Sequence, residues 1–171
     1  MADTGTQPPL LPGNLAAPGG GQVRAILIHP DPVLRGISQP AGYLNGTELA
    51  CLAADLLATM YDAGGRGLAA PQIGILRRIF VMDAGWKEGA ARPLVMLDPE
   101  ILWTSDRHET GQEMCLSIPG QPVGVMRPVS AEIGWYDLSG TYHCADFTGI
   151  AARIALHEAD HLDGRLIVDF L

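Results

Sequence analysis

The sequence predicts a single α+β domain in which antiparallel β-sheets pack around a helix near the C-terminus. Three observations support this class. One amphipathic helix pattern lies near residue 54, a block of short strand-like segments fills the middle of the chain, and a second helix pattern lies near residue 155. A doubly wound parallel sheet would need helices between its strands, and the middle of this chain has no such pattern.

The first helix is expected over about 47–61. Its apolar face is formed by residues that recur at helical spacings: Leu49, Leu52, Leu56, Leu57 and Met60. Asn45 and Glu48 are spaced as a capping pair at the start, and Gly64-Gly65 is expected to end the helix.

The strands are expected in five segments that are short and rich in apolar, β-branched or aromatic residues: Arg78–Asp83, Pro93–Leu97, Glu100–Ser105, Ser130–Asp137 and Thr141–Asp146. Leu138-Ser139-Gly140 predicts a hairpin turn between the last two. The second helix is expected over about 148–162, with Asp146 or Thr148 as its cap and Asp163-Gly164 at its end.

Composition limits the classes of function. The 171 residues are 47% hydrophobic and carry a net charge of −8, which fits a globular protein rather than a nucleic-acid-binding or anionic-membrane-binding one. We found no apolar run near the about 20 residues that span a bilayer. Residues 1–22 are rich in Pro and Gly and have no signal-peptide pattern, so we expect a flexible tail followed by one domain over 23–171.

The three cysteines are Cys51, Cys115 and Cys144. An odd number without a framework spacing suits free thiols in a reducing cytoplasm, and we therefore expect a cytoplasmic protein. Cys51 and Cys144 are expected to be small buried hydrophobic residues.

The most informative segment is His157-Glu158-Ala159-Asp160-His161 on the second predicted helix. Two His residues four positions apart place both imidazoles on one helix face, within reach of one metal ion. Glu158 is rotated by about 100° from His157, so it can reach a metal-bound water more easily than the metal itself. The alternative is a pair of hydrogen-bonded core histidines on the apolar stripe formed with Ile150 and Ile154.

A metal site of this kind needs a third protein ligand. After His161 only ten residues follow, and none is His or Glu, so the ligand must lie upstream. The candidates are the upstream residues with suitable side chains: Cys51, Cys115, Cys144, His29, His108, His143 and Glu113.

Three motifs resemble those of peptide deformylases. They are Gly65-Arg66-Gly67-Leu68-Ala69-Ala70-Pro71-Gln72, Glu113-Met114-Cys115-Leu116-Ser117, and His157–His161 followed by Leu162-Asp163-Gly164. They occur in the family's order, and the resemblance covers about 23–171, including an N-terminal segment that begins at His29. It implies a deformylase-like α+β fold and a metal-dependent hydrolase that removes the formyl group from N-formylmethionyl peptides of nascent chains.

The resemblance also implies roles at the metal. Cys115 would join His157 and His161 as the third ligand, with Fe²⁺ as the metal, one per chain, and Zn²⁺ or another divalent metal as alternatives. Glu158 would transfer protons, and the Gln72 side chain and the Leu116 backbone N–H would stabilise the oxyanion.

Substrate contacts are implied for two groups of residues around these ligands. The first comprises the motif residues Gly65, Arg66, Gly67, Glu113 and Met114, and the second the helix residues Ile150 and Ile154. Glu113 is also expected to support the site by a hydrogen bond or salt bridge, as is Asp160. We expect a monomer whose partners are formylated peptides.

Three positions depart from the family pattern. Met114 stands where Gly is usual, Leu156 where Gln is common before the first His, and Pro122 where many members have Arg. Met would be strained if position 114 needed a positive φ. The alternatives to an active deformylase are therefore a paralogue with altered acyl or peptide specificity, and a metal-holding protein that binds peptides without turnover. A general HExxH endopeptidase is a further alternative, which the missing downstream ligand disfavours.

Overall fold

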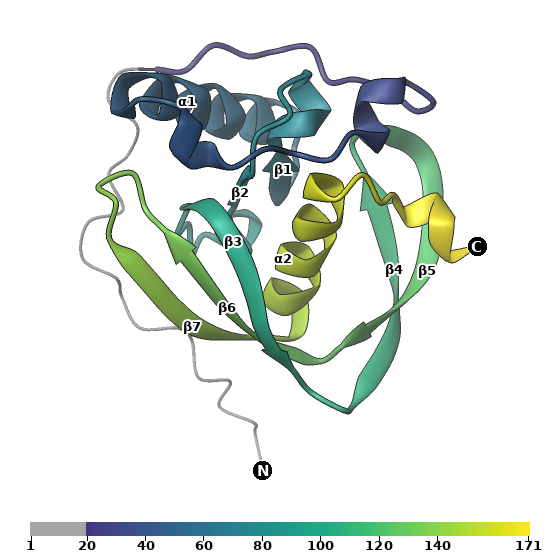
Figure 1. Cartoon of the computed structure of the whole chain (residues 1–171). Helices are drawn as coiled ribbons and strands as arrows, with labels where there is room; N and C mark the ends of the chain where they lie inside the picture. Colours follow the sequence, from purple (N-terminus) through teal and green to yellow (C-terminus); the bar gives the residue numbers. More distant parts are fainter. Residues whose placement is uncertain (1–19) are drawn as a thin grey trace.

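Residues 20–171, which the computed structural model describes, form two β-sheets with helix α2 between them (Figure 1). The main elements are α1 (Gly46–Asp62), β1 (Gly67–Ala69), β2 (Ile79–Met82), β3 (Leu94–Thr104), β4 (His108–Cys115), β5 (Ile118–Pro128), β6 (Ser130–Tyr136), β7 (Tyr142–Thr148) and α2 (Gly149–Leu162). Short 3-10 helices are η1 (Pro32–Arg35), η2 (Ala41–Tyr43), η3 (Ala70–Ile73), η4 (Trp86–Glu88) and η5 (Ile167–Phe170). The predicted α+β class is confirmed.

The larger sheet has the strand order β1-β2-β3-β6-β7, and each neighbouring pair is antiparallel. Alternate residues of β2 point to opposite faces, as the period of a strand requires. Phe80 and Met82 pack in the cluster that contains the apolar residues of α2, whereas Ile79 and Val81 pack in the cluster that contains α1. This end of the sheet therefore lies between the two helices.

Strands β4 and β5 form a separate hairpin on the other side of α2 (Figure 1). Our sequence reading did not predict these strands. Their sequences, HETGQEMC and IPGQPVGVMRP, are rich in polar residues, Gly and Pro, which have low strand propensity. The hairpin buries Val123 and Val125 against Leu34, Leu166 and Ile167, so tertiary packing outweighs weak local preference.

Both predicted helices and all five predicted strand segments are present. The capping pair of α1 is confirmed, because Asn45 Oδ1 accepts from Glu48 N at 3.0 Å and Glu48 Oε2 accepts from Asn45 N at 2.8 Å. Helix α2 starts after Thr148, whose side chain makes no capping bond, and ends at Leu162, with Asp163 as its C-cap. The segments expected over 93–97 and 100–105 form one strand, β3, with a register shift between Leu97 and Glu100.

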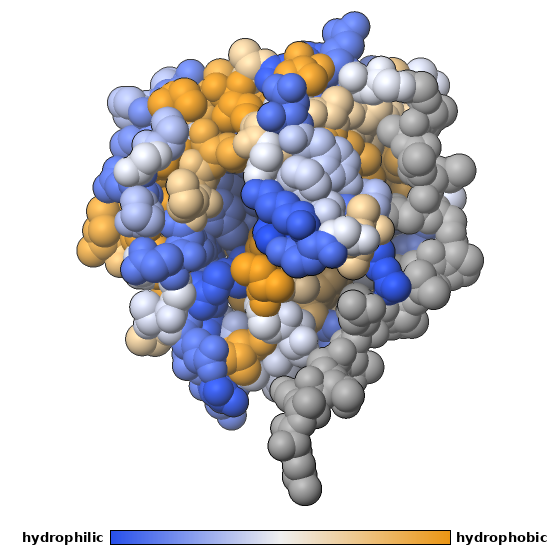
Figure 2. Space-filling model, turned by 180° about the vertical axis from the view of Figure 1, so that it is seen from behind, coloured by the Kyte–Doolittle hydropathy of each residue, from blue (hydrophilic) through white to orange (hydrophobic). Residues whose placement is uncertain are grey.

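The surface of the described part of the chain carries scattered apolar side chains. From the side opposite to Figure 1, hydrophobic residues form separate patches between hydrophilic ones (Figure 2). Within residues 20–171, no helix is both long enough and apolar enough to cross a membrane. The tail expected over 1–22 lies outside the described residues except for its last three, and the domain boundary stays a prediction.

Candidate metal centre

Helix α2 presents His157 and His161 on one face, toward the hairpin. Their imidazole centroids are 5.0 Å apart, as expected for residues one helical turn apart. His161 is 1% exposed, and burial lowers the pKa of its imidazole well below the ordinary value. The ring is therefore neutral, which is the form that binds metals.

Cys115 approaches these imidazoles from the end of strand β4. Its Sγ lies 3.3 Å from His161 Nε2, and one ligand atom from each of Cys115, His157 and His161 lies within 4.8 Å of the others. Among residues 20–171, these three residues form the one group of three or more His, Cys, Asp or Glu side chains that lie close enough to share a metal ion. One thiolate and two imidazoles form a divalent-metal site that leaves a coordination position open, as catalytic sites do.

The other candidates for the third ligand lie elsewhere. Cys51 and Cys144 are both exposed, so the expectation that they are buried hydrophobic residues was wrong. Cys51 lies on α1, and the Cys144 thiol contacts Glu132 on the adjacent strand. His143 contacts Asp137 at 2.7 Å in the β6–β7 hairpin.

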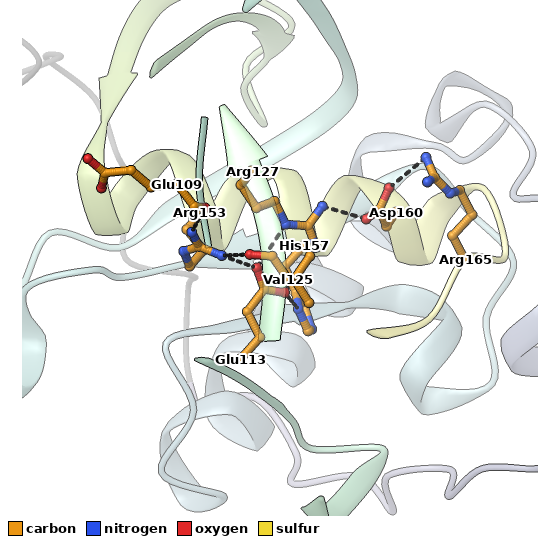
Figure 3. Close-up of polar contacts among 8 residues, drawn as sticks. All are labelled: Glu109, Glu113, Val125, Arg127, Arg153, His157, Asp160 and Arg165. Carbon is orange, nitrogen blue, oxygen red and sulfur yellow. Dashed lines mark hydrogen bonds and ion pairs between the residues drawn. The ribbon is translucent and has the colours of Figure 1, made fainter. Parts of the chain in front are cut away.

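Glu113, two residues before Cys115, fixes the orientation of His157. Its Oε2 lies 2.9 Å from His157 Nδ1, which directs the other ring nitrogen toward the ligand cluster. The same carboxylate is bound by Arg127 and Arg153 (Figure 3). Burial opposes its ionisation, but the bonds from Arg127 and His157 outweigh burial and hold its pKa at about 2. These are the contacts of the supporting role predicted for Glu113.

Asp160 also acts within the protein, as expected, since its Oδ2 accepts from Arg127 Nη1 at 2.6 Å. Arg127 and Arg153 were missed by sequence reasoning. Their partner Glu113 lies 14 and 40 residues away along the chain. The signal that could identify them is the register of the β4–β5 hairpin, which places alternate residues of both strands against α2.

Glu158 is buried next to the ligand cluster. It is 4% exposed, and its Oε2 has no hydrogen-bond partner among residues 20–171. Burial raises the pKa of this carboxyl group to about 7. Gly67 provides the space that Glu158 occupies, because a Cβ at residue 67 would overlap the carboxyl group. An unpaired carboxylate oxygen beside three metal-ligand atoms fits a site that holds a cation and a water molecule.

Gln72 lies in η3 with its amide pointing at Cys115. Its Oε1 accepts from Ala69 N at 2.9 Å, which fixes the amide orientation. Its Nε2 donates to Ser117 Oγ at 3.1 Å and lies 3.7 Å from Cys115 Sγ. An amide N–H is thus held beside the ligand cluster.

Residues 65–67 form the glycine loop, which precedes η3. This loop lies against the other predicted oxyanion donor, Leu116. A Cβ at Gly65 would come within 2.8 Å of Leu116 Cδ1. Trp86 Nε1 donates to Gly65 O at 2.8 Å, and the Arg66 guanidinium binds Glu88. The loop is therefore fixed next to the Cys115 strand.

The remaining predicted substrate residues differ in exposure. Met114 is 71% exposed and Ile150 58%, whereas Ile154 is 9% exposed. The prediction that Ile150 belongs to the buried apolar stripe of α2 is therefore wrong. Met114 is not strained, because the non-glycine residue with positive φ among residues 20–171 is Asp98. Leu156 is buried in the α2 cluster, and Pro122 is exposed on β5.

Comparisons with known proteins agree over most of the chain. The family model for polypeptide deformylase matches residues 23–171. The chain is 41% identical to a peptide deformylase of Bartonella quintana over 87% of this chain and 84% of the relative. It is 45% identical to a peptide deformylase of Alkalilimnicola ehrlichii over 85% of this chain and 80% of the relative.

Solved structures of two relatives have the same fold. A peptide deformylase from Thermotoga maritima superposes with a TM-score of 0.81 at 35% identity, covering 88% of this chain and 98% of that one. A peptide deformylase from Acinetobacter baumannii with bound Met-Ala-Ser superposes with a TM-score of 0.80 at 33% identity, covering 87% and 98%.

Proposed function

The chain belongs to the peptide deformylase family, a family of metal-dependent hydrolases, and from this premise we propose how its residues remove the formyl group from N-formylmethionyl peptides. The observation that carries the proposal is the convergence of Cys115, His157 and His161 beside the buried Glu158.

Cys115, His157 and His161 would hold one divalent cation. We propose Fe²⁺, as the family resemblance implies, with Zn²⁺ as the alternative that the same donors accept. When bound, the cation would supply Lewis acidity and make a water molecule acidic enough to attack a carbonyl carbon at neutral pH.

Glu158 would move the proton in this reaction. Its carboxylate accepts the proton of the attacking water and returns it to the amine that leaves as the formyl C–N bond breaks. Burial raises its pKa to about 7, and a general base is most efficient when its pKa lies near the working pH. Gly67 keeps the space that this carboxylate needs.

The Gln72 amide and the Leu116 backbone N–H would stabilise the negative oxygen that develops on the formyl group. Gln72 suits this role because the bond from Ala69 N holds its Oε1, which leaves Nε2 directed at the cluster. Donors that are fixed before the reaction need no reorganisation in the transition state.

The substrate peptide would bind between β1 and β4. Each pairs with one neighbouring strand among the described residues, and the glycine loop lies against Leu116, beside the end of β4. An extended peptide could add to these edges through its backbone, next to Gly65, Arg66, Gly67 and Met114. Ile150 and Ile154 would supply apolar surface for the methionine side chain.

We propose nascent formylated chains as the partners, a monomer as the working state, and the cytoplasm as the location. The first follows from the family, and the Met-Ala-Ser bound to the Acinetobacter baumannii relative is of the same chemical kind as the expected product. Met114 favours a second possibility, altered acyl or peptide preference, because its exposed side chain stands next to Cys115.

The test is formate release from an N-formylmethionyl tripeptide by protein prepared anaerobically with Fe²⁺. The matched substrate is the N-acetylmethionyl tripeptide. We expect formate from the first, no acetate from the second, and no formate after the metal is removed. Acetate release without formate would contradict the proposal and support altered acyl preference.

A further inference from the structure

We propose that Arg153 is a positioning residue for the metal centre, which acts through Glu113 to orient His157 and ties helix α2 to the hairpin that carries Cys115. This inference rests on the proposed function only in taking Cys115, His157 and His161 as a metal site. Its test measures the environment and the release of the bound metal rather than turnover.

The carboxylate of Glu113 is shared by three groups. Oε1 accepts from Arg127 Nε at 2.8 Å and from Arg153 Nη1 at 2.9 Å. Oε2 accepts from Arg127 Nη2 at 2.9 Å and lies 2.9 Å from His157 Nδ1. Arg153 binds one oxygen and His157 contacts the other, so the Arg153 contact adds to that of Arg127 in fixing the orientation of the carboxylate toward the imidazole (Figure 3).

Arg153 precedes His157 by four residues, so both side chains leave α2 on the same face. The Arg153 guanidinium also donates to two carbonyls of the hairpin. Nη1 reaches Val125 O in β5 at 2.8 Å, and Nη2 reaches Glu109 O in β4 at 2.8 Å. One side chain thus joins the helix that holds two metal ligands to both strands of the hairpin that holds the third.

Gly111 in β4 makes room for this contact. A Cβ at residue 111 would lie 2.8 Å from Arg153 Cζ and 3.0 Å from its Nε and Nη2. Gly111 does not have a positive φ, so the backbone itself does not require glycine there. The requirement comes from the close approach of the guanidinium, and Gly111→Ala therefore perturbs Arg153 without removing it.

Arg127 cannot replace Arg153 in this function. It lies on β5, within the hairpin, and binds α2 at Asp160 rather than at the turn before His157. Loss of Arg153 would leave Glu113 paired with Arg127, so the fold is expected to persist while the carboxylate that contacts His157 is held by one arginine instead of two. Lys could reach Glu113, but its single ammonium cannot reproduce the planar contacts to the carboxylate and two carbonyls.

The experiment uses the full chain loaded with Co²⁺ as a spectroscopic probe. The absorption bands of the cobalt and its thiolate ligand are recorded, together with the rate of Co²⁺ loss to a chelator. For Arg153→Met we expect shifted bands and about tenfold faster loss, the lower end of the effect of outer partners on metal affinity. Arg153→Lys should be intermediate, and Gly111→Ala should shift the bands in the same direction.

The matched control is Arg107→Met, which removes an arginine whose side chain is 75% exposed and pairs with Glu109. It should behave as the wild type. If Arg153→Met folds and shows the bands and Co²⁺ loss rate of the wild type, the proposal is overturned. If Arg153→Met does not fold, the proposal is overturned when Gly111→Ala and Arg153→Lys both show the bands and loss rate of the wild type. Altered bands in a protein whose wild type releases no formate would sustain this inference while the proposed deformylase reaction fails.

Discussion

Helix α2 and the β4–β5 hairpin contribute to the same metal centre through different kinds of structure. The helix supplies His157, Glu158 and His161 within five consecutive residues, and the hairpin supplies Cys115 and the carboxylate of Glu113. The geometry of the helix is local, since its turn alone places two imidazoles side by side. The geometry of the hairpin depends on contacts between residues far apart in sequence. The helix therefore supplies two of the metal ligands and the proton-transfer group, whereas the hairpin supplies the third ligand and the carboxylate that orients His157.

Glu158→Gln tests the contribution of helix α2 to catalysis and has the largest expected effect. This change removes the proton acceptor while it preserves size, so formate release should fall about 10³-fold, within the range of general acid–base catalysis. The metal content should not change, since the proposed ligands are intact. Loss of metal in this variant would show that Glu158 acts on the ligands instead.

Gly67→Ala tests the fit between the glycine loop and the helix. A Cβ there would overlap the Glu158 carboxyl group, so formate release should fall about 10²-fold, as expected when a catalytic group is displaced by about 1 Å. Gly46→Ala is the matched control, because no atom lies within 4 Å of a Cβ at that position. Equal activities of the two variants would show that Glu158 can move aside at no cost.

Glu113→Gln tests the hairpin side. The neutral amide cannot offset the positive charges of Arg127 and Arg153, and it orients His157 less firmly than the carboxylate does. The metal affinity, measured by chelator competition, should therefore fall at least tenfold. The surface variant Glu109→Gln on the same strand, with a side chain 57% exposed, should leave the affinity unchanged. An unchanged affinity in Glu113→Gln would mean that the hairpin contributes Cys115 alone.

A carboxylate in the other hairpin gives the smallest expected effect. Burial opposes the ionisation of Asp137, but hydrogen bonds from Ser139 and His143 outweigh it and hold the pKa at about 2. The folded-state pKa lies below the ordinary 3.8, so this stabilisation is complete above that pH and is lost as the pH falls through about 2.

Asp137→Asn should therefore lower the free energy of unfolding by about 1 kcal/mol at pH 7, and by progressively less as the solution is acidified toward pH 2. Urea unfolding across this range measures the difference. Metal affinity should stay the same, since Asp137 lies in the β6–β7 turn. A stability loss that does not change with pH would exclude ionised Asp137 as its cause.

The difference between helix and hairpin also explains what the sequence could predict. The His157–His161 spacing and the Asn45 cap are local patterns, and the observed bounds of both helices differ from the predicted ones by at most one residue at each end. The strands β4 and β5 were missed because Gly, Pro and polar residues hide their alternation. Cys115 was one of several possible third ligands until the family motifs singled it out.

The errors have physical causes as well. Ile150 lies in the first turn of α2, where its side chain is exposed, so its helical spacing from Ile154 does not bury it. Arg153 reads in sequence as an ordinary charged residue, and its partners lie 28 to 44 residues away. Contacts of this kind follow from strand register, which one sequence does not specify.

If helix α2 and the β4–β5 hairpin meet at one metal ion, X-ray absorption at the metal edge will detect ligands from both. For the Zn²⁺-loaded protein we expect one sulfur scatterer at about 2.3 Å and two imidazole nitrogens at about 2.0–2.1 Å. The sulfur signal should disappear in Cys115→Ser. A wild-type spectrum with nitrogen and oxygen donors and no sulfur would exclude Cys115 as a ligand, because the ion would then be held by the helix without the hairpin.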